Sequence, residues 1–225
     1  MHVINHLDSG LTTYNAMDEL QRELHAKIAA GRHPNTFLLF ETESTYTAGR
    51  HTRAEDIVDD SLPIIETDRA GSVTWHGPGQ LVCYPLVKLA APVDVIQYIR
   101  AVEGAVLDTL QKSFHLDVAR IAGRAGVWLG NRKISAIGLK ISRDTTLHGI
   151  SLNVHTDPAT AFAGVIPCGI TDATVTSMAA EGVNTTLAAV ATPLTAALEH
   201  RLAPLLAPLL APTTIEGDVD VHPAG

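Results

Sequence analysis

Apolar side chains recur at every third or fourth position in two stretches of the chain, which is the spacing of one face of an α-helix. In the first stretch these positions are Tyr14, Met17, Leu20, Leu24 and Ile28. In the second they are Val95, Ile99, Val102, Val106 and Leu110. The pattern therefore predicts an amphipathic helix over residues 12–30, ended by Gly31, and a second helix that Pro92 opens. A last helix is predicted over Thr185–Leu202.

Shorter runs of apolar or alternating residues, bounded by Gly, Pro, Asn or Asp, predict strands. They cover Val3–Leu7, Thr36–Glu41, Leu62–Thr67, Ser72–Trp75, Gln80–Val87, Gly126–Leu129, Arg132–Ser142 and Thr146–Val154. Several of these strands follow one another without a helix between them, whereas residues 155–171 have the Gly and Pro content of a loop. This order favours an α+β fold (mixed α/β), with a mixed or antiparallel sheet flanked by helices, over a doubly wound parallel sheet.

Length, composition and charge then narrow the class of protein. The chain has 225 residues, of which 46% are hydrophobic, and this predicts a single domain over residues 1–212 with an acidic, mobile tail over 213–225. The formal net charge of −8 disfavours a general nucleic-acid binder, which needs a basic surface. The sequence has no signal peptide, no membrane span and only two cysteines, so we expect a soluble, cytoplasmic protein without a disulfide framework.

Cys168 is the candidate nucleophile, because it lies between Pro167 and Gly169 in a loop that can present a sulfur atom to a substrate. A free thiol has a pKa of about 8.5, so it needs a histidine or a lysine to take its proton. Lys133 is the candidate base, since strand periodicity places it beside apolar side chains that remove water from its amine. An incidental loop cysteine and a lysine amine that reaches water remain as alternatives. Cys83, inside an apolar strand, is predicted to be a core residue.

The glycine-rich segment from Arg69 to Gln80 suggests backbone that approaches a bound group, with a decorated hairpin turn as the alternative. It matches neither phosphate-loop fingerprint, and the histidines lack metal-site spacing, so no metal is predicted. We expect His76 to face a ligand, and His148 to be a core histidine with a backbone partner. Six basic residues and no acidic one lie between Arg120 and Arg143, which predicts either a positive face or a charge-protected strand edge.

Three ordered segments of the chain resemble the lipoyl(octanoyl) transferase family. They are RAGSVTWHGPGQLVCYP, then RKISAIGLKISRDTTLHGISLNV, then IPCGI with Thr176-Ser177 after it. The earlier segment from Glu41-Thr42 to Thr47-Ala48-Gly49-Arg50 resembles the same family, and the match in order and spacing runs from about Glu41 to Ser177. The resemblance implies a catalytic domain similar to that of the biotin and lipoate ligases, with a mixed sheet flanked by helices.

The same resemblance implies a reaction and the residues that perform it. An octanoyl group passes from octanoyl-acyl carrier protein to a specific lysine of lipoyl domains, on 2-oxoacid dehydrogenase E2 subunits and on the glycine-cleavage H protein. Cys168 matches the family's acyl-thioester cysteine and Lys133 the lysine that activates it. Neither ATP nor a cofactor is implied, because the acyl group arrives as a thioester. The implied substrate contacts are Arg69, Ala70, Gly71, Ser72, Val73, Thr74, Trp75, His76, Ala136, Ile137, Gly138, Gly149, Ile150 and Ser151.

Two departures from the family pattern affect these expectations. Ala70 stands where the family usually has a glycine, and an alanine there would be strained by ~1 kcal/mol or more if the position needs a positive φ. One extra residue lies near Pro158-Ala159-Thr160, in a predicted loop where an insertion is tolerated. The alternative functions are an ATP-dependent lipoate or biotin ligase of the same fold, a non-enzymatic acyl-binding or partner-docking module, and a cysteine hydrolase.

Overall fold

The two central strands of the molecule, β2 (Thr36–Phe40) and β6 (Gln80–Leu86), are buried at every position. Along β2, Phe37 and Leu39 belong to one apolar cluster, whereas Leu38 and Phe40 belong to another. Since successive side chains of a strand point to opposite faces, both faces of the sheet must be covered. The computed structural model, which describes residues 1–59, 61–165 and 173–208, shows what covers them.

The main sheet has eight strands in the order β1-β2-β6-β10-β9-β8-β7, with β11 paired to β9. Its other members are β1 (His2–Asn5), β7 (Ala119–Ile121), β8 (Arg124–Leu129), β9 (Arg132–Ser142), β10 (Thr145–Asn153) and β11 (Thr174–Val175). The β1–β2 and β9–β11 pairs are parallel, and the remaining neighbours are antiparallel. The fold is therefore α+β with a mixed sheet, which confirms the prediction from strand order.

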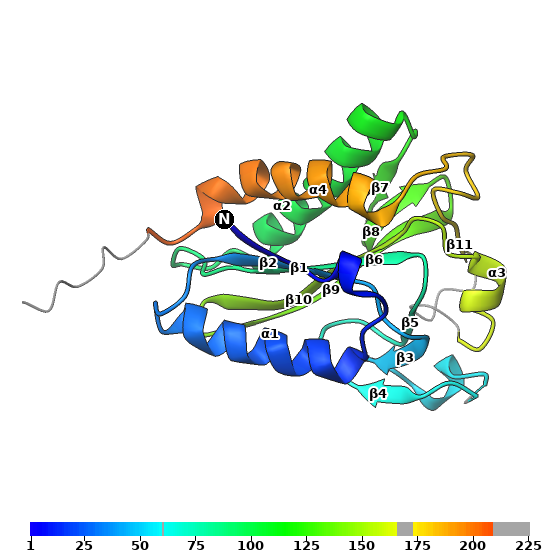
Figure 1. Cartoon of the computed structure of the whole chain (residues 1–225), viewed down its shortest axis with the longest axis horizontal. Coiled ribbons are helices and arrows are strands. Elements are labelled where there is room, and N and C mark those ends of the chain that lie inside the picture. The colour runs from blue at the N-terminus through cyan, green and yellow to red at the C-terminus, as the bar shows by residue number, and fades with distance from the viewer. Residues whose placement is uncertain (60, 166–172, 209–225) are drawn as a thin grey trace, which may run out of the picture.

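Helices cover both faces of this sheet (Figure 1). α1 (Tyr14–Ala29) lies on one face, and α2 (Val95–Asp108) and α4 (Leu187–Leu202) lie side by side on the other. The shorter helical elements are η1 (Leu7–Ser9), η2 (Ala54–Asp56), the π-helical turn η3 (Thr109–Ser113), α3 (Pro158–Ala161) and η5 (Ala203–Leu205). The three long helices lie close to the predicted ranges, because each has a continuous apolar stripe.

The start of the second helix was predicted wrongly. Pro92 does not open α2; the helix begins at Val95, and the Asp94 side chain caps it by accepting a hydrogen bond from the Gln97 N–H. An Asp at the N-cap satisfies one of the free N–H groups of the first turn, which a proline at the first helical position cannot do.

A second sheet of three strands lies beside the first, in the order β4-β3-β5. Its strands are β3 (Thr45–Ala48), β4 (Ile64–Glu66) and β5 (Thr74–His76). β3 was not predicted, because two of its buried side chains are threonines, and their hydroxyls bond to Pro63 and Arg69 from distant segments. This small sheet holds the segment that follows β4 against β9 and β10.

Two hairpins bring the long strands β8, β9 and β10 together. The turn at Gly130-Asn131 joins β8 to β9, as predicted, and Arg143-Asp144 joins β9 to β10 with φ angles of 52° and 55°. Two residues at positive φ are the requirement of the tight hairpin turn that matches strand twist. Gly149 therefore lies opposite Gly138, and Ser151 opposite Ala136.

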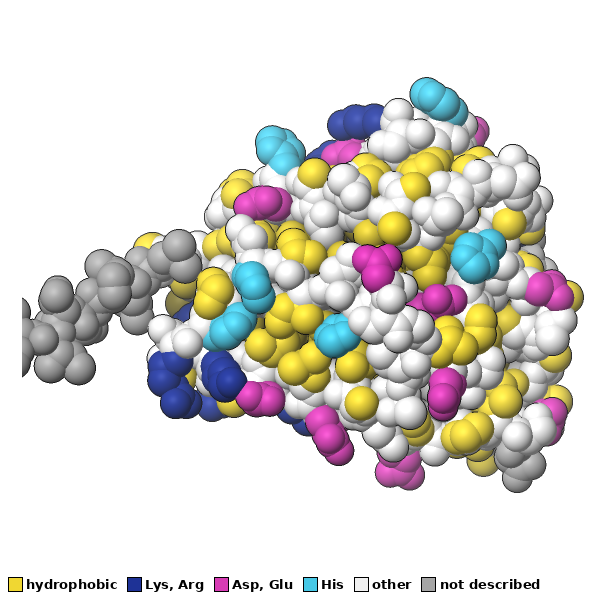
Figure 2. Space-filling view, in the orientation of Figure 1, with side chains coloured by type: hydrophobic (Ala, Val, Ile, Leu, Met, Phe, Trp, Pro, Cys, Tyr) yellow, Lys and Arg dark blue, Asp and Glu magenta, His cyan; other side chains and the backbone are white. Residues whose placement is uncertain are grey.

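In the view of Figure 2, which has α1 in its lower part and α4 in its upper part, Lys and Arg side chains gather at the lower left and at the upper edge and form no continuous patch among the described residues on this side. No helix within the described residues is long and apolar enough to cross a membrane. The predicted acidic tail over residues 213–225 lies outside the described residues, as does Cys168.

Candidate active site

A cavity of about 250 Å³ lies where the glycine-rich segment crosses β9 and β10. Of the expected substrate contacts, those on its wall are Arg69, Ala70, Gly71, Ser72, Val73, Thr74, His76, Ala136, Ile137, Gly138, Gly149 and Ser151. Lys133, Tyr84 and His148 also line it. The cavity is thus formed by five stretches of the chain, within residues 69–76, 84, 123–125, 133–138 and 148–151, which the fold brings together.

Trp75 and Ile150, the other two expected contacts, lie behind this wall. Trp75 is 4% exposed and packs with Tyr46 and Val73, and its ring lies 5.7 Å from that of Phe162. Ile150 is 1% exposed and belongs to the main core. Each is the middle residue of a three-residue strand segment whose outer members line the cavity, so its side chain points to the opposite face.

Lys133 places a buried amine on the cavity wall. The residue is 8% exposed, and its Nζ lies 4.7 Å from the centre of the Trp128 ring, so the side chain is largely withdrawn from water. On its other side Lys133 pairs with Val175 in β11, and its carbonyl accepts a hydrogen bond of 2.9 Å from the Thr176 N–H. Residues 174–176, which come shortly after Cys168 in the sequence, therefore run directly beside Lys133.

The two cysteines differ in what the structure allows. Cys83 is fully buried in the main core, and burial raises the pKa of its thiol well above the ordinary range, which confirms the prediction of a core residue. Cys168 lies outside the described residues. Before it, Val165 bridges to Ile57, and after it Thr174 pairs with Arg132.

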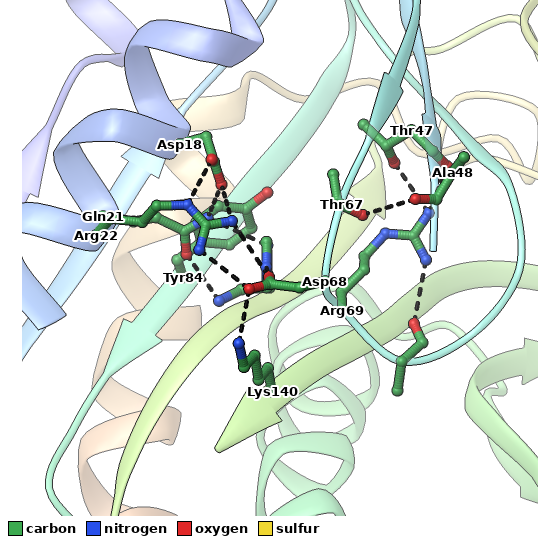
Figure 3. A network of polar contacts seen from close by, with 12 residues as sticks. Asp18, Gln21, Arg22, Thr47, Ala48, Thr67, Asp68, Arg69, Tyr84 and Lys140 are labelled. Carbon is green, nitrogen blue, oxygen red and sulfur yellow. Dashed lines mark hydrogen bonds and ion pairs between the residues drawn. The ribbon is translucent and has the colours of Figure 1, made fainter. Parts of the chain in front are cut away.

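Arg69 holds the glycine-rich segment in place. Its buried guanidinium donates hydrogen bonds to the Thr47 carbonyl at 2.6 Å, to the Thr47 hydroxyl at 2.9 Å and to the Ala70 carbonyl at 3.1 Å (Figure 3). The Ala70 N–H in turn donates to the Leu139 carbonyl at 3.0 Å, which ties the segment to β9. Arginine can make several such bonds at once because its donors are arranged in a rigid plane.

The expected strain at Ala70 is absent. Ala70 is not among the residues with positive φ, whereas Gly71, the next residue, has a φ of +90°. The position that needs a glycine is therefore Gly71, and the alanine that departs from the family pattern occupies ordinary backbone.

Asp68 connects the segment to α1 and to both strands under the cavity (Figure 3). Its carboxylate accepts hydrogen bonds from Arg22 at 3.0 Å, from Lys140 at 2.7 Å and from His148 at 2.8 Å. Partial burial acts to raise the pKa of Asp68, but the hydrogen bonds from Arg22, His148 and Lys140 outweigh it and hold that pKa well below its usual range. Asp68 is therefore an anion that orders three cationic or polar groups around the cavity.

His148 is a core residue, as predicted, but its ring partners are side chains and not the backbone. Gln21 accepts a hydrogen bond from the His148 backbone N–H at 2.8 Å and donates one to Nδ1 at 3.1 Å, while Nε2 lies 2.8 Å from Asp68. Strand periodicity could not reveal this, since α1 and the Asp68 segment reach the ring from distant parts of the chain. Burial lowers the pKa of His148, although the bond to Asp68 acts in the opposite direction.

His76 also faces the cavity, and burial lowers its pKa from 6.5 to about 3, with the nearby Arg69 guanidinium acting in the same direction. Its ring is stacked on Tyr14 with the centres 5.5 Å apart, and its Nδ1 lies 2.7 Å from Gln80 Oε1. His76 is therefore a neutral imidazole at physiological pH.

Of the six basic side chains between Arg120 and Arg143, three pair with carboxylates of described residues, so the expected positive face is partly neutralised. Arg120 pairs with Glu103, Arg132 with Glu181, and Lys140 with Asp68. The sequence segment contains no acidic residue, but the fold brings carboxylates to it from three other segments. A charge count along the chain could not anticipate those pairs.

The matching family model is that of the "Lipoyl protein ligase A/B catalytic domain", over residues 14–199. The protein named octanoyltransferase in Salinispora arenicola is 46% identical over 181 residues, covering 78% of this chain and 84% of that protein. The octanoyltransferase of Cutibacterium acnes is 48% identical over 177 residues, covering 76% of this chain and 64% of the relative. The octanoyltransferase of Mycobacterium tuberculosis (strain H37Rv) is 47% identical over 176 residues, covering 76% of this chain and 75% of the relative.

Solved structures share the fold at low sequence identity. Lipoate-protein ligase A bound with ATP superposes with a TM-score of 0.69 at 17% identity, covering 90% of this chain and 86% of that one. The biotin protein ligase of Aquifex aeolicus in complex with biotin and ATP superposes with a TM-score of 0.58 at 15% identity, covering 90% of this chain and 70% of that one. The fold is thus the one that these lipoate and biotin ligase structures share. By the family model and the relatives, the chain belongs to the lipoyl protein ligase A/B catalytic domain family, and within it to the octanoyltransferases.

Sequence reasoning identified the cavity's glycine-rich segment and Lys133 but missed Tyr84, Asp68 and Gln21. Asp68 directly precedes the segment of residues 69–85 that resembles the family, and Tyr84 lies inside that segment. Their positions in the sequence could therefore have pointed to both residues. Nothing local shows that Gln21, on the first helix, reaches a ring on β10.

Proposed function

We propose that this chain transfers an octanoyl group from octanoyl-acyl carrier protein to a lysine of lipoyl domains, on 2-oxoacid dehydrogenase E2 subunits and the glycine-cleavage H protein. The observation that carries the proposal is the buried side chain of Lys133 on the wall of the cavity, with residues 174–175, shortly after Cys168 in the sequence, paired beside it. The relatives named octanoyltransferase support the acyl group and the reaction class.

The proposed first step forms an acyl-enzyme. The amine of Lys133 accepts the Cys168 thiol proton, and the thiolate attacks the octanoyl thioester carbonyl. The bond to the carrier's sulfur breaks, that sulfur takes a proton, and octanoyl-Cys168 remains. Exchange between two thioesters is nearly balanced in energy, so the step requires neither ATP nor a cofactor.

In the proposed second step, the amine of the acceptor lysine attacks the octanoyl-Cys168 carbonyl. The amine loses a proton to Lys133, the carbon–sulfur bond breaks, and the Cys168 sulfur regains a proton, so that an amide is formed and the enzyme is restored. One base therefore serves both steps.

Chain length is compatible with contact between the two groups. Only residues 169–173 separate Cys168 from Thr174, so the intervening chain spans at most ~20 Å. Thr174 pairs with Arg132 and Val175 with Lys133. A tether of this length lets the thiol reach the amine, which is compatible with the proposed pair.

The test is intact mass spectrometry after mixing the protein with octanoyl-acyl carrier protein. We expect one octanoyl adduct, which Cys168→Ser abolishes and Cys83→Ala leaves in place, since Cys83 is a core residue. Lys133→Met should slow adduct formation by ~10²- to 10⁴-fold. Lys88→Met is the matched control, because Lys88 is also partly buried and donates to the Ala29 carbonyl elsewhere. An adduct at normal rate in Lys133→Met would contradict the assigned base.

The same assay separates the alternative functions. An ATP-dependent ligase would modify a lipoyl domain from free octanoic acid and ATP without Cys168. A hydrolase would release octanoate in place of the amide, and a binding module would hold the acyl group without turnover. We expect none of these outcomes, and any of them would replace the proposed reaction.

A further inference from the structure

A continuous chain of buried hydrogen bonds links His76 to the strand beside Lys133. His76 Nδ1 lies 2.7 Å from Gln80 Oε1, Gln80 Nε2 donates to Asn153 Oδ1 at 2.9 Å, and Asn153 Nδ2 donates to the Thr176 carbonyl at 2.9 Å. The Thr176 N–H then donates to the Lys133 carbonyl at 2.9 Å. None of the side chains in this amide relay is more than 5% exposed.

The direction of every bond in the amide relay is fixed by backbone carbonyls, which can only accept. Asn153 must turn its Nδ2 toward the Thr176 carbonyl, so its Oδ1 faces Gln80. Gln80 Nε2 also donates to the Trp75 carbonyl at 3.3 Å, so the opposite atom, Oε1, faces His76. Because Oε1 is an acceptor, the proton of the imidazole must be on Nδ1.

A neutral imidazole carries one proton, so Nε2 of His76 keeps a free lone pair. Nε2 makes no hydrogen bond to the described residues, and His76 is part of the cavity wall. Burial favours the neutral ring, and the pKa of about 3 means that no proton competes for the lone pair at physiological pH. The amide relay therefore turns a hydrogen-bond acceptor toward the substrate cavity.

We propose that His76 Nε2 is a fixed acceptor for an N–H group of the bound substrate, and that Gln80 and Asn153 are the positioning residues that set its tautomer. This inference rests on the proposed function. Two N–H groups of the proposed reaction have the required chemistry, namely the amides of the donor's thiol-bearing arm and the attacking amine of the acceptor lysine.

The other end of the amide relay gives Asn153 a second role. Besides binding the Thr176 carbonyl, its own carbonyl accepts a hydrogen bond of 3.0 Å from the Met178 N–H. Asn153 thus holds residues 176–178 against the end of β10, while Thr176 is bonded to Lys133. The acceptor at His76 and the amine at Lys133 are positioned by the same rigid network.

The first test reads the tautomer directly and does not depend on activity. Side-chain ¹⁵N NMR of the full chain, with the His76 signals assigned by their loss in His76→Gln, should show a protonated Nδ1 and an unprotonated Nε2 from about pH 6 to about pH 8. A proton on Nε2, or an imidazolium anywhere in that range, would overturn the proposal. If the protein forms no acyl-enzyme, the proposed function fails while the tautomer result still stands.

The second test asks what the lone pair binds, using His76→Gln and His76→Phe. Phenylalanine keeps a ring stacked on Tyr14 but removes the acceptor, so we expect a loss of at least about tenfold in one of the two steps. A loss in acyl-enzyme formation assigns the donor's amide, and a loss in transfer to the lipoyl domain assigns the attacking amine. Normal rates for both steps in His76→Phe would refute the acceptor role.

Gln80→Glu tests the positioning role. A carboxylate cannot donate to Asn153 or Trp75, and it places a negative charge against Nδ1, which favours the imidazolium. We expect the His76 ¹⁵N signals to titrate at a higher pH than in the unsubstituted chain, and the pH profile of the affected step to move with them.

Asn35→Asp is the matched control, since Asn35 is buried and its Oδ1 already accepts from the Lys88 N–H. An unchanged His76 titration in a folded Gln80→Glu protein would exclude Gln80 as the positioning residue, and should that variant not fold, the first test still decides.

Discussion

At the scale of single residues, two buried histidines on the cavity wall are held in opposite tautomers by two glutamines. Gln80 turns its carbonyl oxygen toward His76 Nδ1, whereas Gln21 turns its amide nitrogen toward His148 Nδ1. The orientation of Gln21 is fixed because its Oε1 already accepts the His148 backbone N–H. His148 therefore carries its proton on Nε2 and donates to Asp68. Residue type alone does not decide the chemistry of an imidazole; its partner does.

Ala70 and Gly71 provide a residue-scale prediction. Because Ala70 has no positive φ and is exposed, Ala70→Gly relieves no strain, and we expect it to lower the free energy of unfolding by up to ~1 kcal/mol through the greater freedom of the unfolded chain. Gly71→Ala, at a φ of +90°, should cost ~1 kcal/mol or more even though an added Cβ meets only ordinary contacts. Urea unfolding of both variants checks the order, and a stabilised Ala70→Gly would show that the alanine is strained after all.

At the scale of elements, one buried carboxylate on α2 links this helix to β8, the strand that precedes Lys133 in the chain. Glu103 is fully buried on α2, where it accepts hydrogen bonds from Arg100 at 2.7 Å, Arg120 at 2.9 Å and the Gly126 N–H at 3.1 Å. Gly126 belongs to β8, whose Trp128 ring lies beneath the Lys133 amine. A carboxylate with three donors is stable when buried only because all of them are present.

Glu103→Gln keeps the shape of this side chain and removes its charge. We expect the free energy of unfolding to fall by ~1–3 kcal/mol, because two arginines lose their ionic partner while one of the acceptor bonds must turn into a donor–donor contact. Glu55→Gln is the control, since Glu55 is largely exposed and its pair with Arg53 is 3.8 Å long, and it should change stability by less than ~0.5 kcal/mol. Equal effects of the two substitutions in denaturant unfolding would contradict the special role of Glu103.

Elements with a strong local pattern were predictable from sequence, and contacts between them were not. The strands β2, β6, β9 and β10 and the three long helices follow from their apolar residues, whereas β3 was missed because its buried threonines, Thr45 and Thr47, bond to Pro63 and Arg69 from distant segments. The same limit applies to the site. Lys133 and the glycine-rich segment were identified from sequence motifs, but the bonds of His148 to Asp68 and of Gln80 to Asn153 join residues 80 and 73 positions apart. A local sequence pattern cannot predict such long-range pairs.

At the scale of the whole molecule, the sheet order gathers the site from distant parts of the chain. β6, β10 and β9 are neighbours in the sheet, although α2, η3, β7 and β8 lie between β6 and β9 in the sequence. Tyr84, His148 and Lys133 consequently line one cavity with polar groups that are largely withdrawn from water. Burial of so many titratable groups makes the stability of the folded chain depend on pH.

The direction of that dependence follows from His76 and His148, whose pKa values are both lowered by burial, that of His76 to about 3. In the unfolded chain the pKa of histidine is about 6.5, so above this pH neither the folded nor the unfolded chain binds a proton at these rings, and the free energy of unfolding has its full value. Below this pH the unfolded chain binds protons at these rings and the folded chain does not. The free energy of unfolding therefore falls, with a slope of up to ~1.4 kcal/mol per pH unit for each ring. Urea unfolding between about pH 7.5 and about pH 5 should show this decline, reduced in His148→Gln and unchanged in the exposed control His200→Gln. If the free energy of unfolding stays constant across this interval, both rings must bind protons in the folded state. His76 would then not be a fixed neutral imidazole.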